Sequence, residues 1–160
     1  MIYSLIDQVN LRGYAFEFVA KSILRRQTKN NFIFALSQFD SIDEILKKYR
    51  LVVSDEFLSF VDYLRVEWNR CDLIEFKLNN KKERLIEGII LYDVKTKFHM
   101  VKRDYFEVCS SNDIFMTTAQ AKYDVDSFIV SMIMFDRWRF SVNLYPYYSS
   151  KKRIYSRVKT

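Results

Sequence analysis

Two acids and a lysine in the middle of the chain have side chains that can act together chemically. Asp72 precedes an apolar segment that starts at Leu73, and Asp93 and Lys95 follow the apolar run 89–92. In a strand Asp93 and Lys95 would project from one face, because successive side chains alternate between faces. A charged pair beside an apolar run costs on the order of several kcal/mol per ion unless a partner compensates it. A divalent metal ion and a phosphate are such partners.

A β-hairpin must position these residues. The stretch 71–97 has the pattern of two apolar strands joined by a polar turn at 79–80. Asp72 stands at the head of the first strand, and Asp93 and Lys95 stand at the end of the second. We therefore expect the three side chains to converge within a few ångströms on adjacent strands.

A helix is expected before the hairpin. Apolar residues from Phe16 to Leu24 recur with helical spacing and predict a helix over residues 4–27, with Gly13 dividing a short first turn from its main part. The apolar segment 30–38 is either a short strand or the start of a helix, because periodicity does not separate the two at this length.

A helical insertion is expected over residues 41–68. Ser41 and Glu44 form a capping-box signature for a helix through about residue 49. Ser54 is expected to cap a second helix, whose apolar residues recur with helical spacing as far as Trp68. The aromatic side chains of this segment are interpreted as core packing.

The elements after the hairpin complete an α/β pattern. Residues 98–108 predict a loop and a short strand, and the polar residues 110–112 are expected to cap a helix through about Lys122. The continuous apolar run 128–135 predicts a strand buried on both faces. Residues 138–148 are interpreted as a further edge strand.

This order of elements and the motif together resemble the PD-(D/E)XK nuclease superfamily, whose restriction-endonuclease-like fold includes archaeal Holliday-junction resolvases. The resemblance covers mainly residues 12–27 and 71–145, and Cys71 stands where the family usually has Pro. It implies an α/β domain with a central mixed β-sheet flanked by helices, into which the segment near 41–68 is inserted.

The resemblance also implies an activity, the metal-dependent hydrolysis of phosphodiester bonds in DNA. Asp72 and Asp93 would hold Mg²⁺ or Mn²⁺ together with the Val94 carbonyl, and hard ions of this kind take oxygen ligands. Lys95 would serve the attacking water and stabilise the charge that develops on the phosphate. In this family the first core helix often adds a glutamate to the metal site, and Glu17 is the matching position.

Glu17 has two interpretations. In a helix it lies close to the line of Ala20 and Leu24, at the edge of the apolar stripe, so its carboxylate can face the domain interior. It can complete the metal site, or it can pair with Lys21 at i+4 as an ordinary boundary residue.

A second acid-x-lysine sequence competes with the first. Glu75 and Lys77 have the same spacing, and Asp62 upstream is available as their partner. We favour Asp93 and Lys95, because Asp62 falls within a strongly periodic helix and Lys77 runs directly into the turn.

The composition limits the classes of protein to which the chain can belong. The chain has 160 residues, 49% of them hydrophobic and 29% charged, which is typical of one folded domain over 1–160. A net charge of +6 favours an anionic partner, most commonly nucleic acid. Two cysteines indicate a reducing, intracellular location, which would be the host cytoplasm for a viral or mobile-element protein. No secretory signal or membrane-spanning run is recognised.

Other catalytic classes are poorly provided for. His99 is the only histidine and has no nucleophile signature beside it, and a zinc site from Cys71, His99 and Cys109 lacks closely spaced ligand pairs. No glycine-rich phosphate loop is present.

Nucleic-acid contacts are expected from basic and amide side chains. Lys97 follows the motif, and Gln120 on the later helix corresponds to a region where the resembled family often has Gln or Lys. The tail 149–160 interleaves an aromatic side chain with basic residues, a pattern that suits a phosphate backbone, although solvated disorder is an equal alternative. Its basic residues are Lys151, Lys152, Arg153, Arg157 and Lys159.

Three hypotheses about function follow. The first is a Mg²⁺-dependent or Mn²⁺-dependent nuclease with DNA as its partner. Whether such a nuclease forms a homodimer is left open by the sequence. The second is a non-catalytic nucleic-acid-binding protein that keeps the nuclease-like fold. The third is an interaction module that uses its many aromatic residues.

Overall fold

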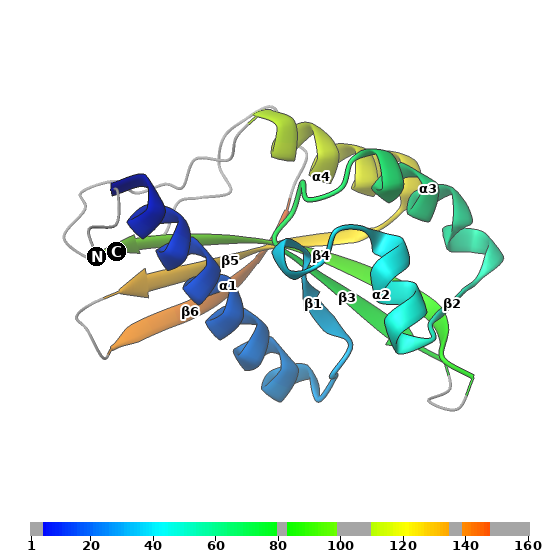
Figure 1. Ribbon diagram of the computed structural model, residues 1–160, viewed down its shortest axis with the longest axis horizontal. Helices are drawn as coiled ribbons and strands as arrows, with labels where there is room; N and C mark the ends of the chain where they lie inside the picture. The colour runs from blue at the N-terminus through cyan, green and yellow to red at the C-terminus, as the bar shows by residue number, and fades with distance from the viewer. Residues whose placement is uncertain (1–4, 80–82, 99–109, 135–138, 148–160) are drawn as a thin grey trace.

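A six-stranded mixed sheet organises the computed structural model, which describes residues 5–79, 83–98, 110–134 and 139–147 (Figure 1). Strands β1, β3 and β4 are antiparallel neighbours, β5 is parallel to β4, and β6 is antiparallel to β5. The short β2 pairs in parallel with the start of β4. The strands are β1 Ile33–Ala35, β2 Val52–Val53, β3 Leu73–Leu78, β4 Leu85–Phe98, β5 Asp126–Met134 and β6 Phe140–Pro146.

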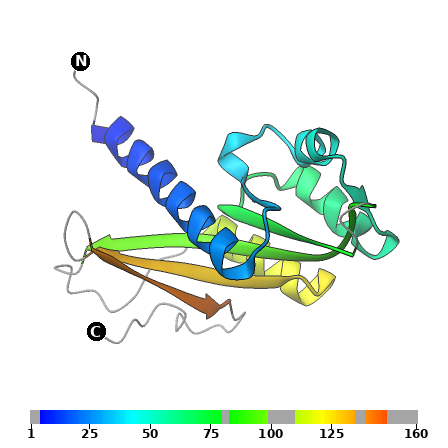
Figure 2. The same ribbon diagram turned by 90° about the horizontal axis from the view of Figure 1, so that it is seen from below.

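Helices cover both faces of this sheet. Helix α1 (Leu5–Thr28) packs with one apolar cluster, and α2 (Ile42–Tyr49), α3 (Leu58–Val66) and α4 (Ser110–Tyr123) pack with the other. Alternate residues of the strands enter the two clusters, as the period of two requires. Figure 2 shows the long strands passing between α1 and α4. The expected class, an α/β domain with a mixed sheet flanked by helices, is confirmed.

The first helix and the segment after it resolve two open points. Helix α1 runs without interruption through Gly13, so the expected division there is wrong. Gly13 has no positive φ, and a glycine inside a helix lowers its stability by only about 1 kcal/mol relative to alanine. Residues 30–38 form β1 and a short 3₁₀ helix, η1 (Leu36–Gln38).

The inserted segment is helical, and one of its two predicted caps is confirmed. The Ser41 hydroxyl accepts a hydrogen bond of 3.3 Å from the Glu44 N–H at the start of α2, and the Glu44 carboxylate accepts from the Asp40 N–H. Ser54 instead precedes a 3₁₀ turn, η2 (Asp55–Phe57), and its side chain makes no capping hydrogen bond. Its buried hydroxyl has no hydrogen-bond partner among the described residues, so the predicted Ser54 cap is wrong.

Substitution of the two serines should separate their roles. We expect Ser41→Ala to cost about 1 kcal/mol, because the Glu44 N–H loses its partner. Ser54→Ala should be neutral or stabilising, because it removes a buried hydroxyl that bonds to nothing described. Urea unfolding of both variants and the wild type measures the difference. Equal losses of stability in the two variants would contradict the assignment.

The later elements match the expectations with shifted boundaries. Strand β4 pairs with β5 from Ile90 to Phe98, so Asp93 and Lys95 lie inside the strand rather than at its end. Helix α4 starts at Ser110, which puts the predicted capping residues within its first turn. Strand β5 is buried over most of its length and β6 lies at the edge of the sheet, as predicted. The loop and strand expected over 99–108 lie outside the described residues.

Membrane insertion by a helix finds no support in the described part of the chain. None of the helices there has both the length and the apolar composition that are needed to cross a bilayer.

Candidate functional site

The predicted acids meet where β3 begins and β4 continues past it. Asp72 directly precedes β3, and its backbone N–H donates to the Tyr92 carbonyl over 3.0 Å, so the chain enters the sheet opposite Asp93. The Asp72 carboxylate accepts a hydrogen bond of 2.6 Å from the Val94 N–H. This bond holds the carboxylate against β4 beside Asp93.

Asp93 is buried and lies next to Lys95. Its exposed fraction is 0%, and its Oδ2 lies 3.0 Å from the Lys95 ammonium nitrogen. Neither carboxylate oxygen of Asp93 has a hydrogen-bond partner of good geometry among the described residues. A buried carboxylate normally accepts several hydrogen bonds. Asp93 therefore keeps acceptor capacity for an additional ligand.

Glu17 reaches the same region from α1. The Ser37 hydroxyl donates to Glu17 Oε2 over 2.8 Å, and the backbone N–H of Leu36 donates to the Asp72 carbonyl over 3.0 Å. Turn η1 therefore links Glu17 to the segment that carries Asp72. The alternative pairing of Glu17 with Lys21 is wrong: no ion pair joins them among the described residues, and the Lys21 ammonium donates to the Gln38 side chain.

Burial and mutual repulsion control the protonation of the acids. Burial, and after it the negative charge of Asp93, raises the pKa of Asp72 to about 8, although the Val94 N–H favours the charged form. Burial also raises the pKa of Glu17, with a smaller contribution from Asp93. At neutral pH without a metal ion, the Asp72 carboxyl therefore holds a proton.

The donor set fits a hard divalent cation. Asp72 and Asp93 present carboxylate oxygens, and the unsatisfied oxygens of Asp93 are the observation that supports the fit. No group of three or more His, Cys, Asp or Glu side chains in the described ranges is arranged as a ready-made metal site. Mg²⁺ is usually held by one or two carboxylates and keeps several waters, so two acids are sufficient. A contribution from Glu17 would require it to move closer.

The competing acid-x-lysine sequence does not form such a cluster. Glu75 is buried and accepts hydrogen bonds from the Tyr92 hydroxyl over 2.5 Å and from the Asn30 amide over 2.9 Å. Glu75 and Lys77 line an open hollow of about 840 Å³, to which Tyr92 also contributes. Tyr92 alternates with Asp93 in β4, so the hollow lies on the opposite face of the sheet. Asp62 is exposed on α3 and is ion-paired with Arg65.

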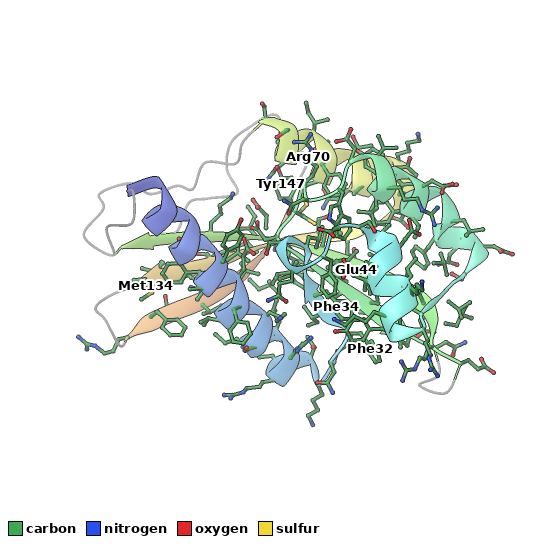
Figure 3. All side chains as sticks on the ribbon, viewed as in Figure 1. Phe32, Phe34, Glu44, Arg70, Met134 and Tyr147 are labelled. Carbon is green, nitrogen blue, oxygen red and sulfur yellow. The ribbon has the colours of Figure 1, made fainter. Side chains whose placement is uncertain are left out.

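Gln120 and the remaining predicted contacts are not part of the cluster. The Gln120 amide donates to the Tyr147 carbonyl, and the Tyr147 hydroxyl donates to the Asp113 carboxylate, which ties α4 to the segment after β6. Figure 3 labels Tyr147 beside α4. In β4, Lys97 pairs with Ile133, and its side chain lies outside the described residues. The basic tail residues Lys151, Lys152, Arg153, Arg157 and Lys159 lie outside them as well, as do the zinc candidates His99 and Cys109.

Sequence reasoning missed Ser37 and Gln38. Both lie in η1, one hydrogen-bonded to Glu17 and the other to Lys21. No spacing signal connects them to α1, because these contacts depend on the direction in which the chain leaves β1. A polar pair directly after a short buried strand was the only hint.

Comparisons of the chain with protein-family models and with curated proteins find no match.

Proposed function

We propose that the protein is a metal-dependent nuclease of the PD-(D/E)XK type that hydrolyses phosphodiester bonds in DNA. The observation that carries this proposal is the convergence of Asp72, Asp93 and Lys95 on one hairpin, with Glu17 on α1 near enough for its charge to act on both acids. The topology supports it: a helix, an antiparallel meander of β1, β3 and β4, and a return through α4 to β5 parallel to β4.

Asp72 and Asp93 would hold the metal ion, with Glu17 and the Val94 carbonyl as further oxygen ligands. When bound, Mg²⁺ or Mn²⁺ supplies charge neutralisation at the phosphate and eases the deprotonation of water. The protein keeps the two carboxylates in place through the Val94 N–H and through the β3–β4 pairing.

Lys95 is the residue that serves the nucleophile. Its side chain is 20% exposed, so the ammonium group can reach a water molecule while it contacts Asp93. It orients the water whose oxygen forms the new bond to phosphorus. As the ester P–O bond breaks, the departing oxygen takes up a proton, and the ammonium offsets the negative charge that accumulates on the phosphate.

DNA is the proposed substrate on electrostatic grounds. The net charge of +6 attracts a polyanion, and a metal ion held by Asp72 and Asp93 would bind a phosphate of the strand.

A second candidate function is DNA binding without hydrolysis. The observation that favours it is the self-compensation of the site: Lys95 neutralises Asp93, and Asp72 holds a proton at neutral pH, so the cluster is stable without a metal ion.

Cleavage assays decide between the two candidates. We expect the purified protein to cut DNA with Mg²⁺ or Mn²⁺, while Ca²⁺ supports binding without efficient cleavage, because its larger and more flexible coordination shell does not hold a compact geometry. Gel analysis of labelled duplex, single-stranded and branched DNA measures the products. Cleavage that persists in excess EDTA would contradict the proposed mechanism, and binding without cleavage in every ion would favour the second candidate.

A further inference from the structure

A strip of α1 continues outward from Glu17. A helix turns by about 100° per residue, so Glu17, Lys21, Tyr14 and Phe18 follow one another around α1 within an arc of about 100°. The buried Ala20 lies on the other side of Glu17. The carboxylate that faces the catalytic cluster therefore borders a surface made of one cation and two aromatic rings, which we call the α1 strip (Tyr14, Phe18 and Lys21).

The two aromatic side chains of the α1 strip are open to solvent. Tyr14 and Phe18 are each 55% exposed, and they lie one helical turn apart. A single exposed aromatic residue needs no explanation. Two of them beside a lysine and a buried acidic cluster form the type of surface on which nucleobases stack.

Lys21 presents its charge at the edge of this surface. The residue as a whole is only 6% exposed, but its ammonium donates to the exposed Gln38 side chain over 3.1 Å and lies 5.0 Å from the centre of the Phe18 ring. Its stem and most of its head are thus buried, and the ammonium lies between two exposed groups, the Gln38 amide and the Phe18 ring. No carboxylate forms an ion pair with Lys21 in the described ranges. A cation held in this way stabilises an anion that arrives from solution.

We propose that the α1 strip binds one unpaired nucleotide of the substrate, next to the bond that is cut. The base stacks on Phe18 and Tyr14, and the adjoining phosphate accepts a hydrogen bond from Lys21. A double helix hides the faces of its bases, so the strip selects DNA with a single-stranded segment over blunt duplex DNA. This inference rests on the proposed nuclease function and names its substrate class.

Binding measurements on the full chain test the stacking. Fluorescence anisotropy in Ca²⁺ compares a labelled single strand with a blunt hairpin duplex of matched length. We expect wild type to prefer the single strand and Phe18→Ala to weaken that binding about tenfold, while duplex binding changes less than twofold. Phe18→Trp should retain the preference, since it keeps an aromatic face. Phe140→Ala is the matched control, because Phe140 is 40% exposed on β6.

The salt dependence of binding tests the contact between Lys21 and the phosphate. Lys21→Gln should reduce the slope of log affinity against log salt for the single strand by about 0.7, the value for one lost phosphate contact. Lys21→Arg should restore the slope. Arg26→Gln is the control, because Arg26 is an exposed cation on another side of the same helix.

The outcomes separate this inference from the nuclease proposal, because the binding assay requires no cleavage. Equal effects of Phe18→Ala on both DNAs, an unchanged salt slope in Lys21→Gln, or wild-type preference for blunt duplex would each overturn the α1 strip as a nucleotide site. Selective loss of single-strand binding supports the strip even if no DNA is cut, and in that case only the hydrolytic proposal fails.

Discussion

Replacing Asp93 with Asn or Lys95 with Met is expected to lower the rate of DNA cleavage about 10³-fold or more without unfolding the protein. Asp93→Asn removes the buried carboxylate that has unsatisfied oxygens, and Lys95→Met removes the ammonium that lies 3.0 Å from it. Both replacements have nearly the same volume as the original side chains, so the packing of β4 is kept. Single-turnover cleavage and circular dichroism measure the two effects.

Matched variants elsewhere control for the loss of a charge. Lys77→Met removes a lysine from β3, and Asp62→Asn removes an exposed acid from α3. Both should cut DNA within about twofold of the wild type, because surface substitutions of this kind change stability by no more than about 0.5 kcal/mol. If Lys77→Met is inactive while Lys95→Met is active, Glu75 and Lys77 form the catalytic motif and our assignment is wrong.

The metal-free protein is expected to lose thermal stability as the pH rises from 5 to 8. The pKa of Asp72 is about 8 in the folded state and about 3.9 in an unfolded chain, so the folded state binds more protons between these values. Stability from such a group is fully present below the unfolded pKa and is lost as the pH rises through the folded pKa. Glu17 acts in the same direction. The three pH units from 5 to 8 correspond to a loss on the order of 4 kcal/mol, or about 8 to 16 °C in Tm.

Variants and ions identify the source of this pH dependence. Asp72→Asn should flatten the decline in Tm and raise Tm at pH 8, because no buried charge has to form. Mg²⁺ at pH 8 should raise the Tm of the wild type, since an ion that binds only the folded state stabilises it, and it should have little effect on Asp93→Asn. Scanning calorimetry at a series of pH values measures both. A wild-type Tm that climbs between pH 5 and 8 while Asp72→Asn stays flat would refute the raised pKa of Asp72.

Local sequence patterns were sufficient to predict the hairpin and the placement of its charged residues. The alternation of side chains in a strand places Asp93 and Lys95 on one face wherever the strand ends, and Asp72 needs only the β3–β4 pairing to lie opposite. The Ser41 cap is equally local, since it depends on residues three positions apart. The coarse α/β class also followed from the order of periodic segments.

Features that depend on a partner distant in the sequence could not be predicted from local sequence patterns. The length of β4 is set by β5, which pairs with it as far as Phe98. The roles of Glu75 and Gln120 depend on which groups the fold brings to them: Tyr92 and Asn30 for one, and the Tyr147 carbonyl for the other. The local sequence around each of these two side chains fits a functional residue as well as a structural one. Only the group to which the fold brings the side chain distinguishes the two roles.

The sequence by itself determined which acids and which lysine lie together on the hairpin, because strand geometry has a period of two whatever surrounds it. Only the tertiary structure decided that Glu17 bonds to Ser37 near these acids and that Lys21 does not pair with it. Both outcomes depend on η1, where Ser37 engages Glu17 and Gln38 engages Lys21. The direction of that turn results from the packing of β1 between α1 and β3, which involves residues far apart in the chain.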